Sequence, residues 1–192
     1  MAGIGIAVSG PLDTGGTRVY VSNHSSYLDA LVLIATLPPE VTFVAKRELA
    51  QSRLLGPFFR RLGCLFVERH AVHEALTSAA EMHAALAARR SLLVFPEGTF
   101  QREPGLLPFH MGAFNAAAAT AAAVVPVALR GTRTMLPDGA LLPRPAALEV
   151  MIGTPLAPAD DSWHAAVKLR QLCREYILAH VREPDLERRS GG

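Results

Sequence analysis

The chain has 192 residues, of which half are hydrophobic and 19% are charged, a composition typical of one globular domain with a substantial buried core. Its formal net charge at pH 7 is only +2, and we expect no nucleic-acid partner. The two cysteines, Cys64 and Cys173, stand far apart and outside any CxxC pair, which excludes a disulfide-rich scaffold and argues against a structural zinc site.

Short apolar or β-branched runs alternate along the chain with longer segments of helical pattern. The predicted strands are Ile4 to Val8, Arg18 to Val21, Thr42 to Ala45, Leu65 to Glu68, Ser91 to Phe95, Val124 to Leu129 and Leu148 to Ile152. The predicted helices are Ser26 to Thr36, Leu54 to Leu62, Val72 to Arg89, Met111 to Ala122 and Ser162 to Val181.

This alternation predicts an α/β fold in which helices flank a mixed, largely parallel sheet. We find no linker that would divide the chain, and we place a single domain at residues 1–183. Residues 184–192 are polar and charged, and we expect them to form a flexible C-terminal tail.

The first functional candidate lies where the strand ending at Val21 runs into the next predicted helix. His24 and Asp29 are five residues apart, and on a continuous helix they would lie on different faces because each residue advances by about 100°. They meet only if His24 lies in a turn before the helix. Ser25 or Ser26 is a suitable N-cap for that turn, and Asp29 then falls in the first helical turn, where the helix dipole favours a carboxylate.

In that position the Asp29 carboxylate can accept a hydrogen bond from one imidazole nitrogen of His24. The other nitrogen is then free to act as a general base toward a substrate hydroxyl, and no nucleophile of the protein is required. Taken alone, the pair also matches an ordinary helix start, since Asn, Ser and Asp are common there.

Two further segments carry candidate residues at strand ends. Residues 92–99 read Leu-Leu-Val-Phe-Pro-Glu-Gly-Thr, a buried strand followed by a turn whose backbone N–H groups and Thr99 can face a ligand. Residues 63–69 form another strand that ends in Arg69, and a guanidinium is well suited to a bidentate contact with phosphate. Alone, the first segment is better explained as a plain strand and turn, and an arginine at the end of a strand is more often a surface residue.

Together, in this order and spacing, the segments resemble the glycerolipid acyltransferase family of bacterial 1-acylglycerol-3-phosphate acyltransferases. The likeness runs from Ile4 to Leu156. It rests on four motifs: Asn23-His24 followed after four residues by Asp29, the strand that ends in Arg69, residues 95–99 (Phe-Pro-Glu-Gly-Thr), and Val125-Pro126-Val127.

The resemblance implies the fold of a glycerol-phosphate acyltransferase and the transfer of a fatty acyl group from acyl-CoA or acyl carrier protein. The acceptor would be a hydroxyl of lysophosphatidate or a related lysophospholipid. His24 would be the general base, Asp29 would orient it, and no cofactor or metal is implied. Arg69 would bind the acceptor's phosphate, Lys46 would add positive charge near the acceptor, and the turn residues Glu97, Gly98 and Thr99 would help to position it.

Two places depart from the family pattern, and both concern the choice of substrate. Phe100 stands where the pattern usually has an arginine after Glu-Gly-Thr. Either Arg102, two places later, supplies the missing cation, or the acceptor depends less on phosphate. His110 and Met111 stand where lysines are frequent.

We expect the protein to lie on a membrane surface rather than to cross the bilayer. The longest apolar stretch, Ala113 to Leu129, is interrupted by polar residues and a proline, whereas a spanning helix needs roughly 20 strongly apolar residues. The N-terminus lacks the basic start and apolar run of a signal peptide. Six cations and two anions lie from Lys46 to Arg69, a candidate surface for anionic headgroups, although a solvated face fits equally well. The expected location is cytoplasmic, peripheral on the inner face of the cell membrane.

Two other functions stay open on these residues. A thioesterase or lipid esterase would use His24 to activate water as the acceptor. A non-catalytic module would bind lipid or acyl carrier protein without consuming a thioester.

Overall fold

The computed structural model describes residues 5–12, 15–51, 56–61, 63–67, 72–140 and 142–187. Within them, strands β1 to β7 form one mixed sheet in the order β1-β7-β6-β2-β5-β3-β4. All neighbouring strands are parallel except β6 and β7, which are antiparallel. Their bounds are β1 Ile6–Ser9, β2 Arg18–Ser22, β3 Thr42–Lys46, β4 Leu65–Val67, β5 Leu92–Val94, β6 Ala123–Arg130 and β7 Leu148–Ile152.

The helices are α1 Asp29–Thr36, α2 Arg47–Gln51, α3 Gly56–Arg61, α4 Val72–Ala87, α5 Gly112–Ala119, α6 Thr132–Met135 and α7 Trp163–Val181. The mixed, largely parallel sheet with flanking helices confirms the predicted fold class. The short helices α2 and α6 were not predicted, because four or five residues are too few to show a helical period. Of the helix predicted at Leu54 to Leu62, which corresponds to α3, residues Leu54, Leu55 and Leu62 lie outside the described part of the chain.

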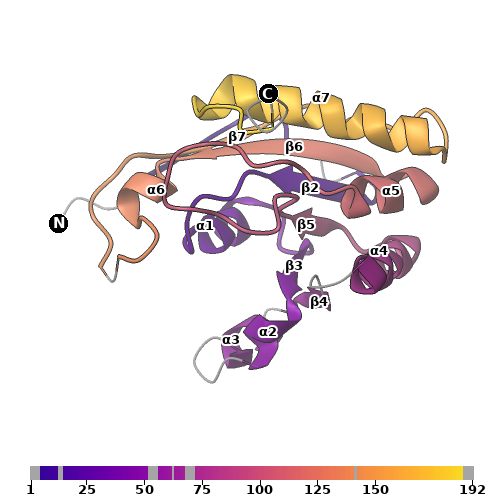
Figure 1. Ribbon diagram of the computed structural model, residues 1–192, viewed down its shortest axis with the longest axis horizontal. Coiled ribbons are helices and arrows are strands. Elements are labelled where there is room, and N and C mark those ends of the chain that lie inside the picture. Colours follow the sequence, from indigo (N-terminus) through magenta and orange to yellow (C-terminus); the bar gives the residue numbers. More distant parts are fainter. Residues whose placement is uncertain are drawn as a thin grey trace.

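Helices cover both faces of the sheet, as the alternating side chains of β2 show. Val19 and Val21 belong to an apolar cluster that includes Phe114 of α5 and Ile177 of α7. Tyr20 points to the other face and joins a cluster with Leu33 of α1. Figure 1 shows α7 beside β6 and β7, α4 and α5 together at one end of the sheet, and α2 and α3 beyond β3 and β4.

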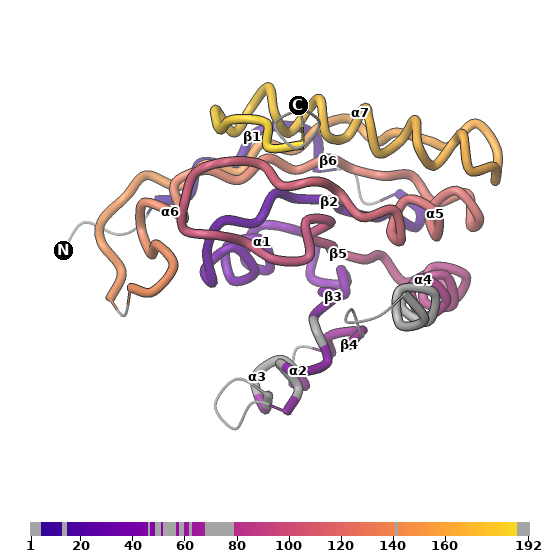
Figure 2. The backbone as a smooth tube through the Cα atoms, in the orientation of Figure 1, coloured from indigo at the N-terminus to yellow at the C-terminus, as the bar shows by residue number. Residues whose placement is uncertain are grey.

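Residues 184–187, at the start of the predicted flexible C-terminal tail, are held by hydrogen bonds. Residues 184–187 pair with the loop that follows β5, where the Leu106 N–H donates to the Pro184 carbonyl (2.9 Å) and the Leu186 N–H donates to the Leu106 carbonyl (3.1 Å). Figure 2 lets the reader follow both stretches. The charged residues of this segment suggested exposure to solvent. In the structure, however, Asp185 accepts a hydrogen bond from Arg174. Residues 188–192 lie outside the described part of the chain.

Among the helices that the structure describes, none is both long enough and apolar enough to cross a bilayer.

Candidate functional site

The candidate site lies at the carboxyl edge of the two central strands β2 and β5. These strands are parallel and in register, with Val21 beside Val94, so the residues that follow them emerge at the same edge. His24 comes two residues after β2, and Phe95, Pro96 and Glu97 follow β5 directly. This edge is where open α/β sheets place their ligands.

His24 and Asp29 meet as the sequence predicted. The His24 Nδ1 lies 2.8 Å from the Asp29 Oδ2, and Asp29 is the first residue of α1. The Asp29 side chain is completely buried, while 18% of the His24 side chain is exposed. A carboxylate only accepts hydrogen bonds, so Nδ1 carries the proton of this bond and Nε2 takes no part in it.

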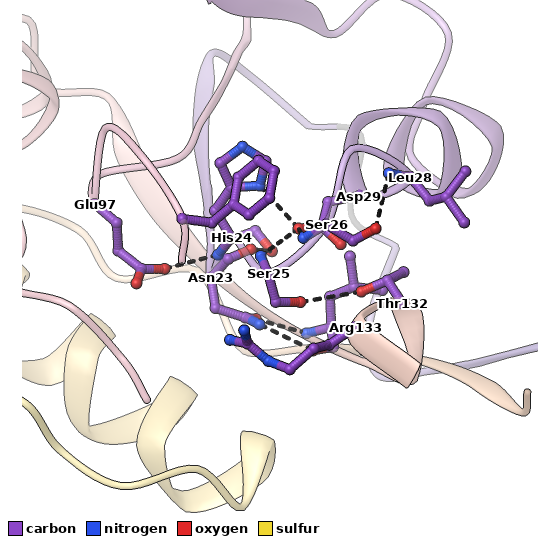
Figure 3. Close-up of polar contacts among 12 residues, drawn as sticks. Asn23, His24, Ser25, Ser26, Leu28, Asp29, Glu97, Thr132 and Arg133 are labelled. Atoms are coloured by element: carbon purple, nitrogen blue, oxygen red, sulfur yellow. Dashed lines mark hydrogen bonds and ion pairs between the residues drawn. The ribbon is translucent and has the colours of Figure 1, made fainter. Parts of the chain in front are cut away.

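The Asp29 carboxylate also holds the turn in front of its own helix. Its Oδ2 accepts hydrogen bonds from the backbone N–H of Ser25 (2.5 Å) and of Ser26 (2.9 Å). The predicted serine N-cap is therefore wrong in its detail: α1 has Leu28 as N-cap, with no side-chain cap. Asp29 occupies the first turn and reaches back to N–H groups of the turn that precedes the helix, while the Ser26 hydroxyl accepts from the Leu28 N–H at 3.2 Å (Figure 3).

Glu97 holds the backbone of His24 from the side of β5. Its Oε1 accepts from the His24 N–H (2.7 Å), and its Oε2 accepts from the Leu107 N–H (2.8 Å). Figure 3 shows this carboxylate on the opposite side of His24 from Asp29. Burial raises the pKa of Glu97 from 4.5 to about 8, because desolvation outweighs the two backbone hydrogen bonds that oppose it.

Side chains of the same turn fasten it to β6 and α6. Asn23 exchanges two hydrogen bonds with the backbone of Leu129, donating to its carbonyl (2.9 Å) and accepting from its N–H (2.8 Å). The Ser25 hydroxyl bonds the Thr132 hydroxyl at 3.1 Å. The Ser26 hydroxyl donates to the Leu136 carbonyl at 2.8 Å. The His24 turn is thus fixed from three directions, by β5, β6 and α6.

Two aromatic rings contact the His24 imidazole directly. Phe95 stacks on it with ring centroids 4.1 Å apart and an interplanar angle of 7°. Phe100 lies at 4.5 Å and 61°. Its own outer neighbour is Tyr27, at 4.8 Å and 83°.

The structure describes the remaining predicted binding residues to different degrees. Gly98 forms the turn after β5 with φ 72°, a conformation that favours glycine, and Thr99 beside it is exposed. Arg102 is exposed two residues after Phe100. Lys46 ends β3 beside Val67 of β4, and its side chain is not among those described. Arg69 lies outside the described residues.

The structure therefore brings His24, Asp29 and Glu97 together and leaves the predicted acceptor contacts as predictions. Sequence reasoning missed that Glu97 bonds the His24 backbone and that Asn23 bonds Leu129. Their partners are 73 and 106 residues away in the chain, and no local pattern connects such positions. Only a weak signal in the sequence pointed to the stacking of Phe95 on His24. If two predicted strands are parallel neighbours, the residues that follow them lie close together.

Comparisons with known proteins point to one family. The Acyltransferase family matches residues 6–130. The 1-acyl-sn-glycerol-3-phosphate acyltransferase of Escherichia coli strain K12 is 30% identical over 176 residues, which cover 90% of this chain and 70% of that protein. The protein of the same name from Limnanthes douglasii is 31% identical over 162 residues, 84% of this chain and 57% of that protein.

The fold has a close solved counterpart. The crystal structure of the 1-acyl-sn-glycerophosphate (LPA) acyltransferase from Thermotoga maritima matches with a TM-score of 0.77 at 24% sequence identity, covering 92% of this chain and 70% of that one. The chain spans about half the length of the curated plant relatives it matches, 57% for Limnanthes douglasii and 51% for Cocos nucifera. Because the family match takes in both strand ends that build the His24 site and well over half of the sequence, the chain belongs to the Acyltransferase family.

Proposed function

We propose that this protein transfers a fatty acyl group from a thioester donor, acyl-CoA or acyl carrier protein, to a hydroxyl of lysophosphatidate or a related lysophospholipid. The observation that carries the proposal is the His24 to Asp29 pair, with a buried carboxylate on Nδ1 and a partly exposed imidazole at the carboxyl edge of β2. The names of the relatives, 1-acyl-sn-glycerol-3-phosphate acyltransferases, support the acceptor class.

In the proposed reaction, His24 Nε2 takes the proton from the acceptor hydroxyl while that oxygen attacks the thioester carbonyl. Asp29 keeps Nδ1 protonated and stabilises the imidazolium that forms. The tetrahedral intermediate then collapses to the new ester, the carbon–sulfur bond breaks, and the leaving thiolate takes the proton from Nε2. The reaction needs no cofactor, because the thioester is already an activated acyl group.

Acceptor binding is proposed for the other residues that the family resemblance implies. Arg69 would bind the phosphate, with Lys46 and Arg102 as additional cations, and the turn of Glu97, Gly98 and Thr99 would position the acceptor. We also propose that the protein works on the inner face of the cell membrane as a peripheral protein, since both its acceptor and its product would be lipids.

The test is an assay of purified protein with acyl-CoA and lysophosphatidate, glycerol 3-phosphate or an uncharged lysolipid in turn. General-base catalysis contributes about 10²- to 10⁴-fold, so His24→Ala should lower turnover by roughly that factor with the fold intact. His83→Ala is the matched control, because His83 is exposed on α4. Near-normal turnover of His24→Ala would refute the mechanism.

The same assay separates the two rival functions. A transferase consumes thioester mainly when acceptor is present, whereas a hydrolase consumes it at the same rate without acceptor. A binding module leaves the thioester intact, and its lipid binding is indifferent to Asp29→Asn. For a transferase, Asp29→Asn should lower turnover by about 10⁴-fold, because an amide at this position favours the wrong imidazole tautomer.

A further inference from the structure

Three side chains contact the His24 imidazole, and one of them stands on a loop. Asp29 is the first residue of α1, and Phe95, which is 5% exposed, directly follows β5. Phe100 contacts the ring at 61° from the irregular stretch between β5 and α5. A helix and a strand fix the first two side chains, whereas Phe100 needs support from another part of the chain.

Arg133 of α6 gives that support. Its Nη1 donates to the carbonyls of Gln101 and Arg102, the two residues that follow Phe100. Its Nε and Nη2 donate to the two carboxylate oxygens of Glu183, both at 3.0 Å. This bidentate pair fixes the plane of the guanidinium, so Nη1 is held in place against the loop.

The residue before Arg133 holds the other side of the same ring contact. Thr132 is completely buried, and its hydroxyl bonds the hydroxyl of Ser25, the residue that follows His24, at 3.1 Å. Figure 3 shows both α6 side chains and the bond from Thr132 to Ser25. Two adjacent residues of one short helix therefore connect to the chain directly after His24 and directly after Phe100. We conclude that α6 sets how the two rings lie relative to each other.

The Arg133 guanidinium is committed to these contacts. Its four hydrogen bonds use four of the five N–H groups of a guanidinium, and 15% of the side chain is exposed. We propose that Arg133 is a positioning residue of the acyl transfer, which holds Phe100 against the imidazole and thereby keeps His24 aligned without touching the substrate. This inference rests on the proposed function and adds a residue to its machinery.

The kinetic test separates positioning from substrate binding. Arg133→Ala should lower kcat for transfer to lysophosphatidate by about tenfold or more and leave KM unchanged, because a displacement of about 1 Å near the reacting groups can cost about 100-fold in rate. Arg133→Lys, which keeps the charge and can keep one bond, should have an intermediate kcat, and it carries the test alone if Arg133→Ala does not fold. A wild-type kcat in the tested variant, or a raised KM with unchanged kcat, would overturn the proposal.

Arg130→Ala is the matched control. Arg130 lies three residues earlier and forms an ion pair of the same kind at 2.9 Å, but with Glu149 of β7. It should keep the wild-type kcat and KM. If Arg130→Ala lowers kcat as much as Arg133→Ala does, the effect is a general one of lost ion pairs and the positioning role is wrong.

Nuclear magnetic resonance gives a readout that a general loss of stability does not move, because it reports on the folded molecules. The His24 and Phe100 ring centroids are 4.5 Å apart, so their protons should show a nuclear Overhauser effect in the wild-type protein and in Arg130→Ala. Arg133→Ala should lose this effect and keep the one between His24 and Phe95, whose ring centroids are 4.1 Å apart.

This measurement needs no substrate, so it separates failure of the inference from failure of the proposed function. A wild-type protein that transfers no acyl group but shows the Arg133-dependent ring contact refutes the proposed function alone. A contact between His24 and Phe100 that survives in Arg133→Ala overturns the role of Arg133, whatever the activity.

Discussion

Two buried acidic side chains, Glu97 after β5 and Asp29 at the start of α1, hold three successive backbone N–H groups at the site. Glu97 binds the N–H of His24, and Asp29 binds those of Ser25 and Ser26. Asp29 also binds the imidazole itself. The position of the His24 ring is therefore set both through its side chain and through its backbone, which is the arrangement that a precisely placed general base needs.

Glu97→Gln tests the backbone half of this arrangement. A glutamine has one accepting oxygen, so its NH₂ group would face a second backbone donor, either the His24 N–H or the Leu107 N–H. We expect unfolding free energy to fall by about 1–3 kcal/mol, because one buried N–H loses its acceptor. Turnover should fall with little change in KM. Denaturant unfolding and steady-state kinetics measure both, and the exposed Glu103→Gln in the same loop is the control.

The raised pKa of Glu97 predicts a pH-dependent stability. The folded protein holds this proton up to about pH 8, whereas the unfolded chain releases it near 4.5. The folded state binds more protons between these values, so the stabilisation is complete below pH 4.5 and is lost as pH rises to 8. Each pH unit in this window is worth up to about 1.4 kcal/mol.

The measurement is denaturant unfolding at several pH values for the wild-type protein and Glu97→Gln. The stability of the wild-type protein relative to the variant should fall as pH rises from 5 to 8, since glutamine does not titrate in this range. A constant difference across that range would show that Glu97 does not keep its proton in the folded protein.

At the scale of elements, the link from β6 to α6 depends on one glycine. Gly131 has φ 92°, and a Cβ there would lie 1.9 Å from the carbonyl oxygen of Ala147, which precedes β7. The next residue, Thr132, bonds Ser25 of the His24 turn. This glycine therefore allows β6, β7 and the site to approach one another closely.

Gly131→Ala should destabilise the protein far more than Gly139→Ala. Both glycines have positive φ, but a Cβ at Gly139 meets nothing within 4 Å. Gly139→Ala should cost about 1–2 kcal/mol for the backbone conformation alone. Gly131→Ala adds a clash with backbone atoms, which cannot rotate away, and should cost several kcal/mol more. Thermal unfolding of the two variants checks this difference, and equal costs would contradict it.

The sequence predicted elements well where their signal was local. The β2, β5 and β6 strands were found because each is a run of apolar residues bounded by breakers, and α7 because its long helical pattern follows residues that can cap a helix. In the structure Ser162 is that cap and accepts from the Ala165 N–H. The His24 to Asp29 contact was also local, five residues apart. The supports of that contact were not predictable, because Leu129 and Thr132 reach the turn only through the order of strands in the sheet.

At the scale of the whole molecule, residues 183–187, which follow α7, support the loop that follows β5. Glu183 accepts from the Gly105 N–H (2.8 Å) and pairs with Arg133. Arg174, which is 5% exposed, donates to the carbonyls of Leu106 and Leu107 and to Asp185. This loop carries the Leu107 N–H that Glu97 binds, so the C-terminal segment lies only one contact away from the residue that holds His24.

Truncation after Arg182 tests this long-range support. It removes Glu183 and Asp185, and the buried Arg174 then loses the carboxylate of Asp185. Breaking one side of a buried ion pair costs about 3–5 kcal/mol, so the truncated protein should unfold at lower denaturant concentration. The matched control ends after Glu187 and keeps every one of these contacts.

Hydrogen exchange gives the readout that separates a local effect from a general loss of stability. The Leu106 N–H loses its acceptor, the Pro184 carbonyl, and the Leu107 N–H lies in the freed loop, so both should exchange faster than expected from the change in global stability. The N–H of Val19, a fully buried residue of the central strand β2, should follow global stability alone. If Leu106 and Leu107 also follow only the global change, the loop holds its position without the C-terminal segment, because Glu97 and Arg174 suffice to fix it.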